Sequence, residues 1–266
     1  MLAPRTHQLE RSPRPPRATL LVFTLGPEAE VRRRQLLPTP LGDREAALHR
    51  ACLEEALAAG RGAGCRLEVS SPPGSRLEAL PPDAAGVAQR GECFGERFAH
   101  AFDAAAARSS VPVVAVGTDT PGLREEHVTR AVALLREGGD DRVVIGPSPD
   151  GGFYLLAANR PLGDLLTGVR WCRRTTLAHL RRLLHRAGLA VALLEPLADL
   201  DQRTDLEGWL ARLPLARDLH GATVRLATAI ARALAALRRP STPSVLGRPR
   251  LIPAPVPRGR APPSHR

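Results

Sequence analysis

Short apolar runs alternate with amphipathic stretches through the middle of this chain. The runs at 20–23 and 113–116 are uninterrupted and rich in branched side chains, which is typical of buried strands. Apolar residues within 94–107 instead recur three and four positions apart, which predicts a helix with one buried face. The same patterns predict strands at 20–23, 65–69, 113–116, 142–145, 153–157 and 190–194, and helices at 43–60, 94–107, 123–137, 174–187, 203–212 and 221–237. This alternation predicts an α/β fold, a three-layer sandwich with a mostly parallel central sheet.

The first of the predicted helices begins with Asp43 as its cap and is expected to end at Gly60. Cys52 shares an apolar stripe of this helix with Leu48 and Ala56, so we expect it to be a small buried side chain. The four cysteines lie far apart and form no C-x-x-C pair. A cysteine metal site and a thioredoxin-type redox site therefore have no support.

Composition separates the two ends of the chain from its middle. The net charge of +11 consists of +3 in 1–17, +9 in 219–266 and −1 in 18–218, and every one of the 38 basic residues is arginine. The proline- and arginine-rich ends cannot bury a core. We therefore predict disordered basic tails at 1–17 and 238–266 around one folded domain, 18–237. Because that domain is electrically neutral, we expect no nucleic-acid partner, although binding of polyanions through the tails stays open as an alternative.

Membrane insertion and export also find no support in the pattern. No apolar run approaches the length of about 20 residues that spans a bilayer. The apolar stretch 19–24, which follows four arginines, is too short for a signal peptide. We expect a cytoplasmic protein without a transmembrane segment.

Acidic residues follow several of the predicted strands. In parallel sheets, ligands bind beyond the carboxyl ends of the strands, so these positions are the candidates for chemistry. Asp119 stands in Gly117-Thr118-Asp119-Thr120-Pro121-Gly122-Leu123, where it could hold a divalent cation or simply cap the next helix. Asp150 lies in a loop rich in proline and glycine, where it could face a ligand or simply be part of an ordinary turn. Asp201, in Asp199-Leu200-Asp201, could bind a metal or cap the helix at 203–212.

Three common nucleotide and hydrolase motifs are missing from the sequence. No G-x-G-x-x-G follows the first strand, which leaves a dinucleotide-binding domain without its fingerprint. A phosphate-binding loop of the G-x-x-x-x-G-K-[ST] type is excluded because the chain has no lysine. There is no G-x-S-x-G for an α/β-hydrolase.

Taken together, several short motifs resemble those of one bacterial family. They are Gln89-Arg90-Gly91, Phe94-Gly95-Glu96-Arg97, Gly117-Thr118-Asp119-Thr120-Pro121-Gly122-Leu123, Gly146-Pro147 with Asp150-Gly151-Gly152-Phe153-Tyr154-Leu155, Trp171, and Asp199-Leu200-Asp201. The family consists of glycosyltransferase-A-like (GT-A) proteins of largely uncharacterised function, some named as arsenosugar-biosynthesis glycosyltransferases. The resemblance covers about 18–210, and the pairing of G-x-D-x-P-G-L with D-G-G-[FY]-Y-L is its most specific part.

The resemblance implies a nucleotide-diphospho-sugar transferase fold and assigns roles to individual residues. Asp119 would bind a divalent cation, Mg²⁺ or Mn²⁺, and together with Thr118 the nucleotide, while Asp201 would be a second metal ligand. Asp150 would face the acceptor as general base or positioning group. Arg33 and Arg90 would contact phosphates.

One loop departs from the family pattern. The family has Pro-x-Pro-Gly-x-x-Lys-Thr-Arg-Leu after its first strand, whereas this chain has Glu30, Arg33, Arg34 and Gln35 where the family has Gly, Lys, Thr and Arg. Arg33 keeps a positive charge that can bind phosphate.

The expected function is metal-dependent transfer of a sugar from a nucleotide-sugar to a small-molecule acceptor. Two alternatives remain open: a nucleotidyltransferase of the same fold acting on a phosphorylated small molecule, and a binding protein whose catalysis has drifted away. Release of pyrophosphate would identify the first of these alternatives.

Overall fold

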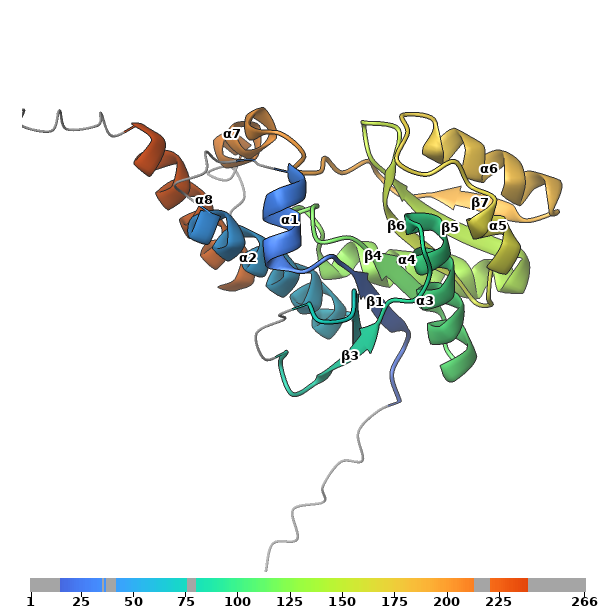
Figure 1. Ribbon diagram of the computed structural model, residues 1–266. Coiled ribbons are helices and arrows are strands. Elements are labelled where there is room, and N and C mark those ends of the chain that lie inside the picture. The colour runs from blue at the N-terminus through green and yellow to red at the C-terminus, as the bar shows by residue number, and fades with distance from the viewer. Residues whose placement is uncertain (1–14, 35, 37–41, 76–79, 213–220, 239–266) are drawn as a thin grey trace, which may run out of the picture.

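The structure is a computed structural model, and it describes residues 15–34, 36, 42–75, 80–212 and 221–238 (Figure 1). Within these residues the strands are β1 Thr19–Phe23, β2 Arg66–Ser71, β3 Ala84–Ala88, β4 Val113–Val116, β5 Arg142–Pro147, β6 Phe153–Ala158 and β7 Ala190–Leu193. The helices are α1 Pro27–Arg34, α2 Gly42–Gly62, α3 Phe94–Arg108, α4 Glu125–Gly138, the short 3₁₀ helix η2 Gly139–Asp141, α5 Gly163–Thr167, α6 Thr176–Arg186, α7 Arg203–Arg212 and α8 Gly221–Arg238.

The strands form one mostly parallel sheet in the order β3-β2-β1-β4-β6-β5-β7. Only β6 runs against its neighbours, pairing antiparallel with β4 and with β5. The other pairs, including β1 with β2 and with β4, are parallel. The carboxyl ends of the parallel strands therefore lie along one edge of the sheet.

Helices cover both faces of the sheet, which explains why its central strands β1 and β4 are apolar at nearly every position. Alternate residues of β1 show this division: Leu20 and Val22 pack into a core that includes α2 and α4. Leu21 and Phe23 pack into a second core with α3, α5 and α6. These layers confirm the predicted three-layer α/β sandwich.

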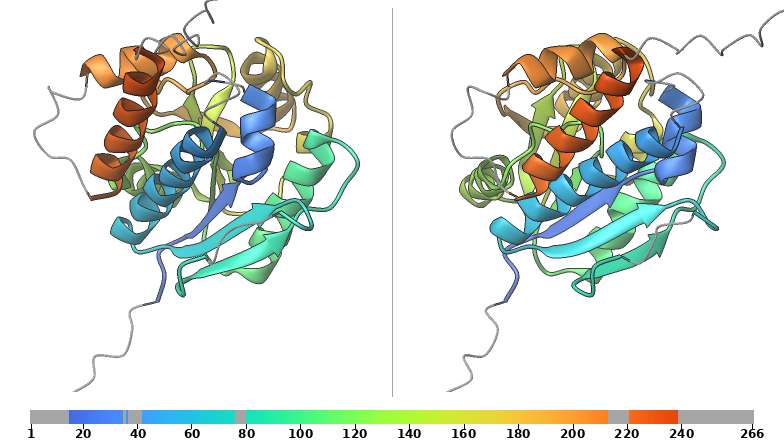
Figure 2. Two further views of the ribbon diagram at one scale, coloured as in Figure 1. Left: turned by 60° about the vertical axis from the view of Figure 1, so that its left-hand side comes forward. Right: turned by 90° about the vertical axis from the view of Figure 1, so that its left-hand side faces the viewer.

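A third, smaller core joins the helices outside the sheet. In Figure 2, α8 lies beside α2 along one side of the molecule. Leu226 and Ile230 of α8 are fully buried in this cluster with Cys52 of α2, as predicted for Cys52. Leu200, from the segment after β7, belongs to the same cluster, so this core also fixes the chain beside the acidic residues described below.

Several element boundaries differ from the sequence expectations, two of them at helix ends. The helix predicted to end at Gly60 continues to Gly62. A Cβ atom at Gly60 would lie 2.6 Å from Leu20 Cδ2 and 2.7 Å from Leu67 Cδ2, so this glycine permits close packing on the sheet instead of ending the helix. The helix expected from 123 begins at Glu125. The sequence patterns also missed α1, β3 and α5.

The predicted tails, 1–17 and 238–266, lie outside the described residues except for residues 15–17 and 238. The single domain at 18–237 stays a prediction. In the part of the chain that the structure describes, no helix is both long and apolar enough to cross a membrane.

Candidate functional site

Three chain segments bring aspartates to the carboxyl edge of the sheet. Asp119 follows β4, Asp150 lies between β5 and β6, and Asp199 and Asp201 follow β7. The segments are tied by backbone hydrogen bonds: the N–H of Leu200 donates to the carbonyl of Asp119 at 2.8 Å. We call Asp119, Asp150, Asp199 and Asp201 the acid site.

Asp119 is held by an arginine and caps no helix. The N-cap of α4 is Arg124, so the capping alternative for Asp119 is wrong. Its Oδ2 atom instead accepts a hydrogen bond of 2.6 Å from Arg34 Nη2. Burial alone would raise the pKa of Asp119, but the charge and hydrogen bond of Arg34 outweigh it and hold that pKa below its usual value.

Arg34 contacts the acid site but, like Asp199, received no role in the sequence analysis. Its side chain is only 4% exposed, and each nitrogen of its guanidinium donates a hydrogen bond. Nε donates to Glu30 at 3.0 Å, Nη2 to Asp119, and Nη1 both to Asp201 at 2.5 Å and to the carbonyl of Leu200 at 2.7 Å. Burial favours the neutral form, but the three carboxylates prevail and raise the pKa of Arg34 above its ordinary value.

The local sequence explains how Arg34 reaches this position. After β1 the chain turns at Gly26, whose φ of 88° suits glycine, and enters α1. Acidic Glu28 and Glu30 stand in the first turn of α1 and arginines in its last, which matches the helix dipole. The Glu30–Arg34 spacing of four residues, an ion pair on one helix face, was the signal in the sequence that could have indicated this contact.

Asp150, Asp199 and Asp201 form a group that could hold a metal ion. One ligand atom from each lies within 4.8 Å of the others. Burial, followed by the charges of Asp201, Asp150 and Asp119, raises the pKa of Asp199 to about 7. Carboxylate oxygens are the ligands that Mg²⁺ and Mn²⁺ prefer, so the donor set fits such an ion.

Asp150 has a structural task as well. Its Oδ1 accepts a hydrogen bond of 2.7 Å from the N–H of Gly152, so the predicted turn is present. Gly151 has a φ of 92°, and a Cβ atom there would collide with the carbonyl oxygen of Arg174. The turn therefore fixes an exposed carboxylate at the rim of the acid site.

At the start of α7 it is the carboxylate of Asp205, not that of Asp201, that bonds to backbone N–H groups. The carboxylate of Asp205 accepts hydrogen bonds from the N–H groups of Asp201 and Gln202, at 3.1 and 2.7 Å. The Asp201 carboxylate, 45% exposed, is bonded to Arg34 instead.

The remaining predicted residues are Arg33, Thr118 and Arg90, and each lies in a different part of the fold. Arg33 is 47% exposed and pairs with Glu30 at 3.5 Å, on the same helix as Arg34. Thr118 is buried, and its hydroxyl lies 3.3 Å from that of Thr24, which joins the loops after β1 and β4. Arg90 is exposed beyond β3, the edge strand three places from β4 in the sheet, so the fold does not bring it to the acid site.

Aromatic rings gather beside the β5–β6 turn, which the sequence analysis did not predict. Trp171 lies within 5.1–5.7 Å, between ring centroids, of Phe94, Phe98 and Phe153. Phe94, Phe153 and Trp171 are only partly buried. They provide an apolar wall next to Asp150.

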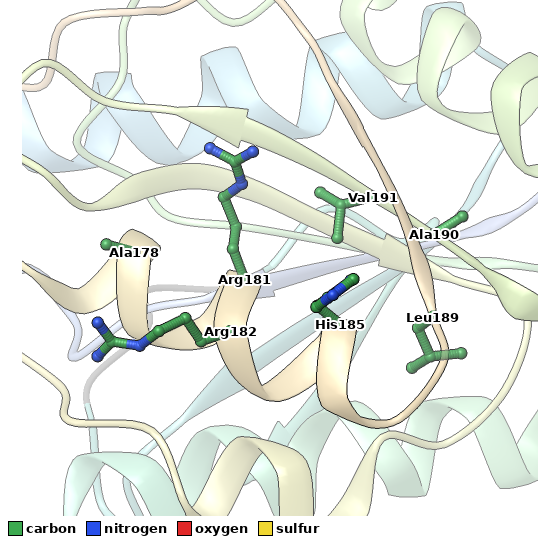
Figure 3. Close-up of a pocket in the computed structure, with 7 residues that line it drawn as sticks. All are labelled: Ala178, Arg181, Arg182, His185, Leu189, Ala190 and Val191. Atoms are coloured by element: carbon green, nitrogen blue, oxygen red, sulfur yellow. The ribbon is translucent and has the colours of Figure 1, made fainter.

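A separate groove of about 550 Å³ lies between α6 and β7 (Figure 3). It is lined by Ala178, Arg181, Arg182, His185, Leu189, Ala190 and Val191. The guanidinium groups of Arg181 and Arg182 point in different directions, and no residue of the acid site lines the groove. Its lining therefore offers no converging set of carboxylates or cations that could bind a metal ion or a phosphate.

Comparison with solved structures supports the fold. A protein from Desulfovibrio desulfuricans G20, provisionally described as a nucleotide-diphospho-sugar transferase, is 24% identical with a TM-score of 0.68; the match covers 82% of this chain and 98% of that one. A 4-diphosphocytidyl-2C-methyl-D-erythritol synthase from Anaerococcus prevotii DSM 20548 is 12% identical with a TM-score of 0.52, over 75% and 99% of the two chains. These likenesses show that the chain has a nucleotide-diphospho-sugar transferase-like fold.

A more distant match is the Rv0371C complex with manganese from Mycobacterium tuberculosis H37Rv. It is 17% identical with a TM-score of 0.48, over 72% of this chain and 97% of that one. A likeness this distant says nothing about a metal in the present chain. We found no match among curated proteins.

One family comparison concerns the sequence itself. Residues 45–173 match the family described as "Uncharacterized protein conserved in bacteria (DUF2064)". The matched segment contains Asp119 and Asp150, whereas Arg34 and Asp201 lie outside it. The likeness to this family extends over residues 45–173, slightly less than half of the chain.

Proposed function

We propose that this chain is a GT-A-type glycosyltransferase that moves a sugar from a nucleotide-sugar donor to a small-molecule acceptor. The observation that carries the proposal is the acid site, which lies beyond the carboxyl ends of β4, β5 and β7 and is contacted by Arg34 of α1. Carboxylates and cations at this edge are what a nucleoside diphosphate and its counter-ion require. The nucleotide-diphospho-sugar transferase-like fold is consistent with this chemistry.

A divalent cation, Mg²⁺ or Mn²⁺, is part of the proposal. Asp119 and Asp201 are the proposed ligands, and Asp150 and Asp199 lie near enough to Asp201 to contribute oxygens. When bound, the cation would neutralise charge on the departing nucleoside diphosphate.

The chain's own residues have separable tasks in this proposal. Thr118 and Asp119 would contact the nucleotide, and the exposed guanidinium of Arg33 would contact its phosphates. Arg90 remains a proposed phosphate contact only for a ligand that extends across β1 and β2. Asp150 would accept the proton of the acceptor hydroxyl while that oxygen bonds to the sugar and the nucleoside diphosphate leaves with the electron pair.

Nucleotidyl transfer on the same fold is the second candidate. It is favoured by the likeness in fold to the cytidylyl-type synthase from Anaerococcus prevotii. The two reactions differ in their products, because nucleotidyl transfer from a nucleoside triphosphate releases pyrophosphate and sugar transfer releases a nucleoside diphosphate. A coupled pyrophosphate assay with phosphorylated acceptors therefore separates them.

The decisive experiment is a calorimetric titration of the full chain with UDP, GDP, CDP and dTDP, each with and without Mn²⁺. We expect one nucleotide to bind in a metal-dependent manner, and Asp119→Asn to lose this binding. Asp140→Asn, at an exposed position in η2, is the matched control and should bind as the unchanged protein does. Binding that survives Asp119→Asn unchanged, or no binding of any nucleotide, would contradict the proposal.

A further inference from the structure

The feature that leads beyond the proposed function is the position of Arg34. A cation of the chain itself already lies where two proposed metal ligands meet. The Arg34 guanidinium joins Asp119, from the loop after β4, to Asp201, from the segment after β7, at 2.6 and 2.5 Å. Its side chain is 4% exposed, whereas the side chains of Asp119 and Asp201 are 27% and 45% exposed, so a buried arginine bonds to carboxylates that solvent reaches.

A metal ion held by both aspartates would need the space between the same two carboxylates. Carboxylate oxygens bind Mg²⁺ at about 2.0–2.1 Å, and one ion bound by both aspartates must lie between them. The guanidinium lies there, with Nη2 against Asp119 Oδ2 and Nη1 against Asp201 Oδ1. An ion in that space and the guanidinium cannot be present together.

We propose that Arg34 is the resident cation of the acid site and competes with a divalent metal ion for Asp119 and Asp201, so that a metal binds both carboxylates only after Arg34 has left them. This deepens the proposed function, on which it rests for the identity of the metal ligands. It adds a residue that controls whether the metal site is available.

The carboxylates of the site attract both Arg34 and a divalent ion. Arg34 brings one positive charge to Glu30, Asp119 and Asp201, while Asp150 and Asp199 add further carboxylates next to Asp201. A divalent ion brings two charges into the same volume. Arginine compensates with fixed planar donors that suit two carboxylates at once.

The position of Arg34 in the fold allows it to leave. It is the last residue of α1, and its long side chain can change rotamer without unwinding the helix. The cost of release appears directly in metal affinity, because the apparent dissociation constant equals the intrinsic one divided by the fraction of molecules ready to bind. If the arginine-bound state is preferred about tenfold, metal affinity falls about tenfold.

The experiment is a calorimetric titration of the full chain with MnCl₂ alone, which needs no substrate and no activity. We compare the unchanged protein with Arg34→Met, which keeps an apolar stem and removes the charge. We expect Arg34→Met to bind Mn²⁺ at least about tenfold more tightly, and the gain to disappear in Arg34→Met/Asp119→Asn. Arg225→Met is the matched control: Arg225 is exposed on α8 and pairs with Glu54, so its loss should leave Mn²⁺ affinity unchanged.

Each other outcome overturns the inference. Equal Mn²⁺ affinity in the unchanged protein and Arg34→Met, a gain that survives Asp119→Asn, or no Mn²⁺ binding in any folded variant would each contradict competition. If circular dichroism shows that Arg34→Met does not fold, Arg34→Lys decides in its place. A lysine ammonium cannot hold both carboxylates in a planar fork, so Arg34→Lys should also bind Mn²⁺ more tightly than the unchanged protein.

The inference and the proposed function can fail separately. Nucleotide titrations in the presence of Mn²⁺ test the proposed function, whereas titrations with MnCl₂ alone test the competition. A chain that binds a nucleotide but shows no competition between Arg34 and Mn²⁺ keeps the proposed function and loses the inference. A chain that shows competition but binds no nucleotide does the reverse.

Discussion

Replacing Arg34 with methionine should destabilise the protein by about 3 kcal/mol in the absence of metal. The change removes one guanidinium and leaves the carboxylates of Glu30, Asp119 and Asp201 facing one another. Breaking a buried ion pair from one side costs about 3–5 kcal/mol, because the remaining charge is left uncompensated. Asp119 and Asp201 are 27% and 45% exposed, so water screens part of this cost and we expect the lower end of that range.

The neighbouring arginine provides a matched control. Arg33 lies on the same helix, is 47% exposed and has one ion pair, with Glu30 at 3.5 Å. Exposed pairs of this kind contribute about 0–1 kcal/mol, so Arg33→Met should change the free energy of unfolding by less than about 1 kcal/mol. The difference between the two variants isolates the burial and bridging of Arg34 from the loss of a positive charge on α1.

A double-mutant cycle locates the interaction. Asp119→Asn removes one of the charges that Arg34 compensates, so the double variant Arg34→Met/Asp119→Asn should lose less stability than the sum of the single changes. The measurement is urea unfolding followed by circular dichroism, with chelator present to exclude metal. The reasoning is wrong if Arg34→Met and Arg33→Met have equal effects, or if the cycle is additive within about 0.5 kcal/mol.

Three further predictions concern pH, the core and a turn. Burial lowers the pKa of His49 to about 4, below the ordinary 6.5. The unfolded chain therefore binds a proton that the folded chain does not, and the free energy of unfolding falls by up to about 3 kcal/mol as pH drops from 6.5 toward 4. Urea unfolding across this range should show a weaker dependence of that free energy on pH for His49→Gln. Phe102→Ala should cost about 3–5 kcal/mol in the same assay, because Phe102 is fully buried between α3 and the sheet. Gly151→Ala should lower the thermal midpoint more than Gly188→Ala: both glycines have positive φ, but only at Gly151 would the added Cβ collide with backbone, the carbonyl of Arg174. Equal midpoints for these two variants would contradict the role assigned to the turn.

The sequence predicts the buried strands well because a buried strand is recognisable from a short run of apolar residues. β1 and β4 are apolar at nearly every position since both faces of the sheet are covered. β3, Ala84–Ala88, gave no such pattern because it is an edge strand of alanine, glycine and valine that is largely exposed. α1 was also missed because it shows no apolar pattern. It is short and strongly polar, and ion pairs at its carboxyl end fix its position.

Some residues of the acid site could likewise be predicted from the sequence, and others could not. Asp119, Asp150 and Asp201 could be named in advance because a parallel sheet brings the ends of its strands to one edge, whatever the sequence between them. The choice between Arg33 and Arg34 could not be made without knowing that the segment is helical. Successive residues of a helix point about 100° apart, so one of two adjacent arginines faces solvent and the other faces the aspartates.

The parts of the site depend on one another across the boundary of the family match. Asp119 and Asp150 lie within residues 45–173. Arg34, which bonds to both Asp119 and Asp201, lies before that segment, and Asp201 lies after it. β1 also lies outside it, yet it pairs with both β2 and β4 in the middle of the sheet. A fragment cut to 45–173 would lose the strand that joins β2 to β4 and would expose the core on both faces of the sheet. The chemistry of the matched segment therefore belongs to the larger domain, and variants of the acid site have to be measured in the full chain.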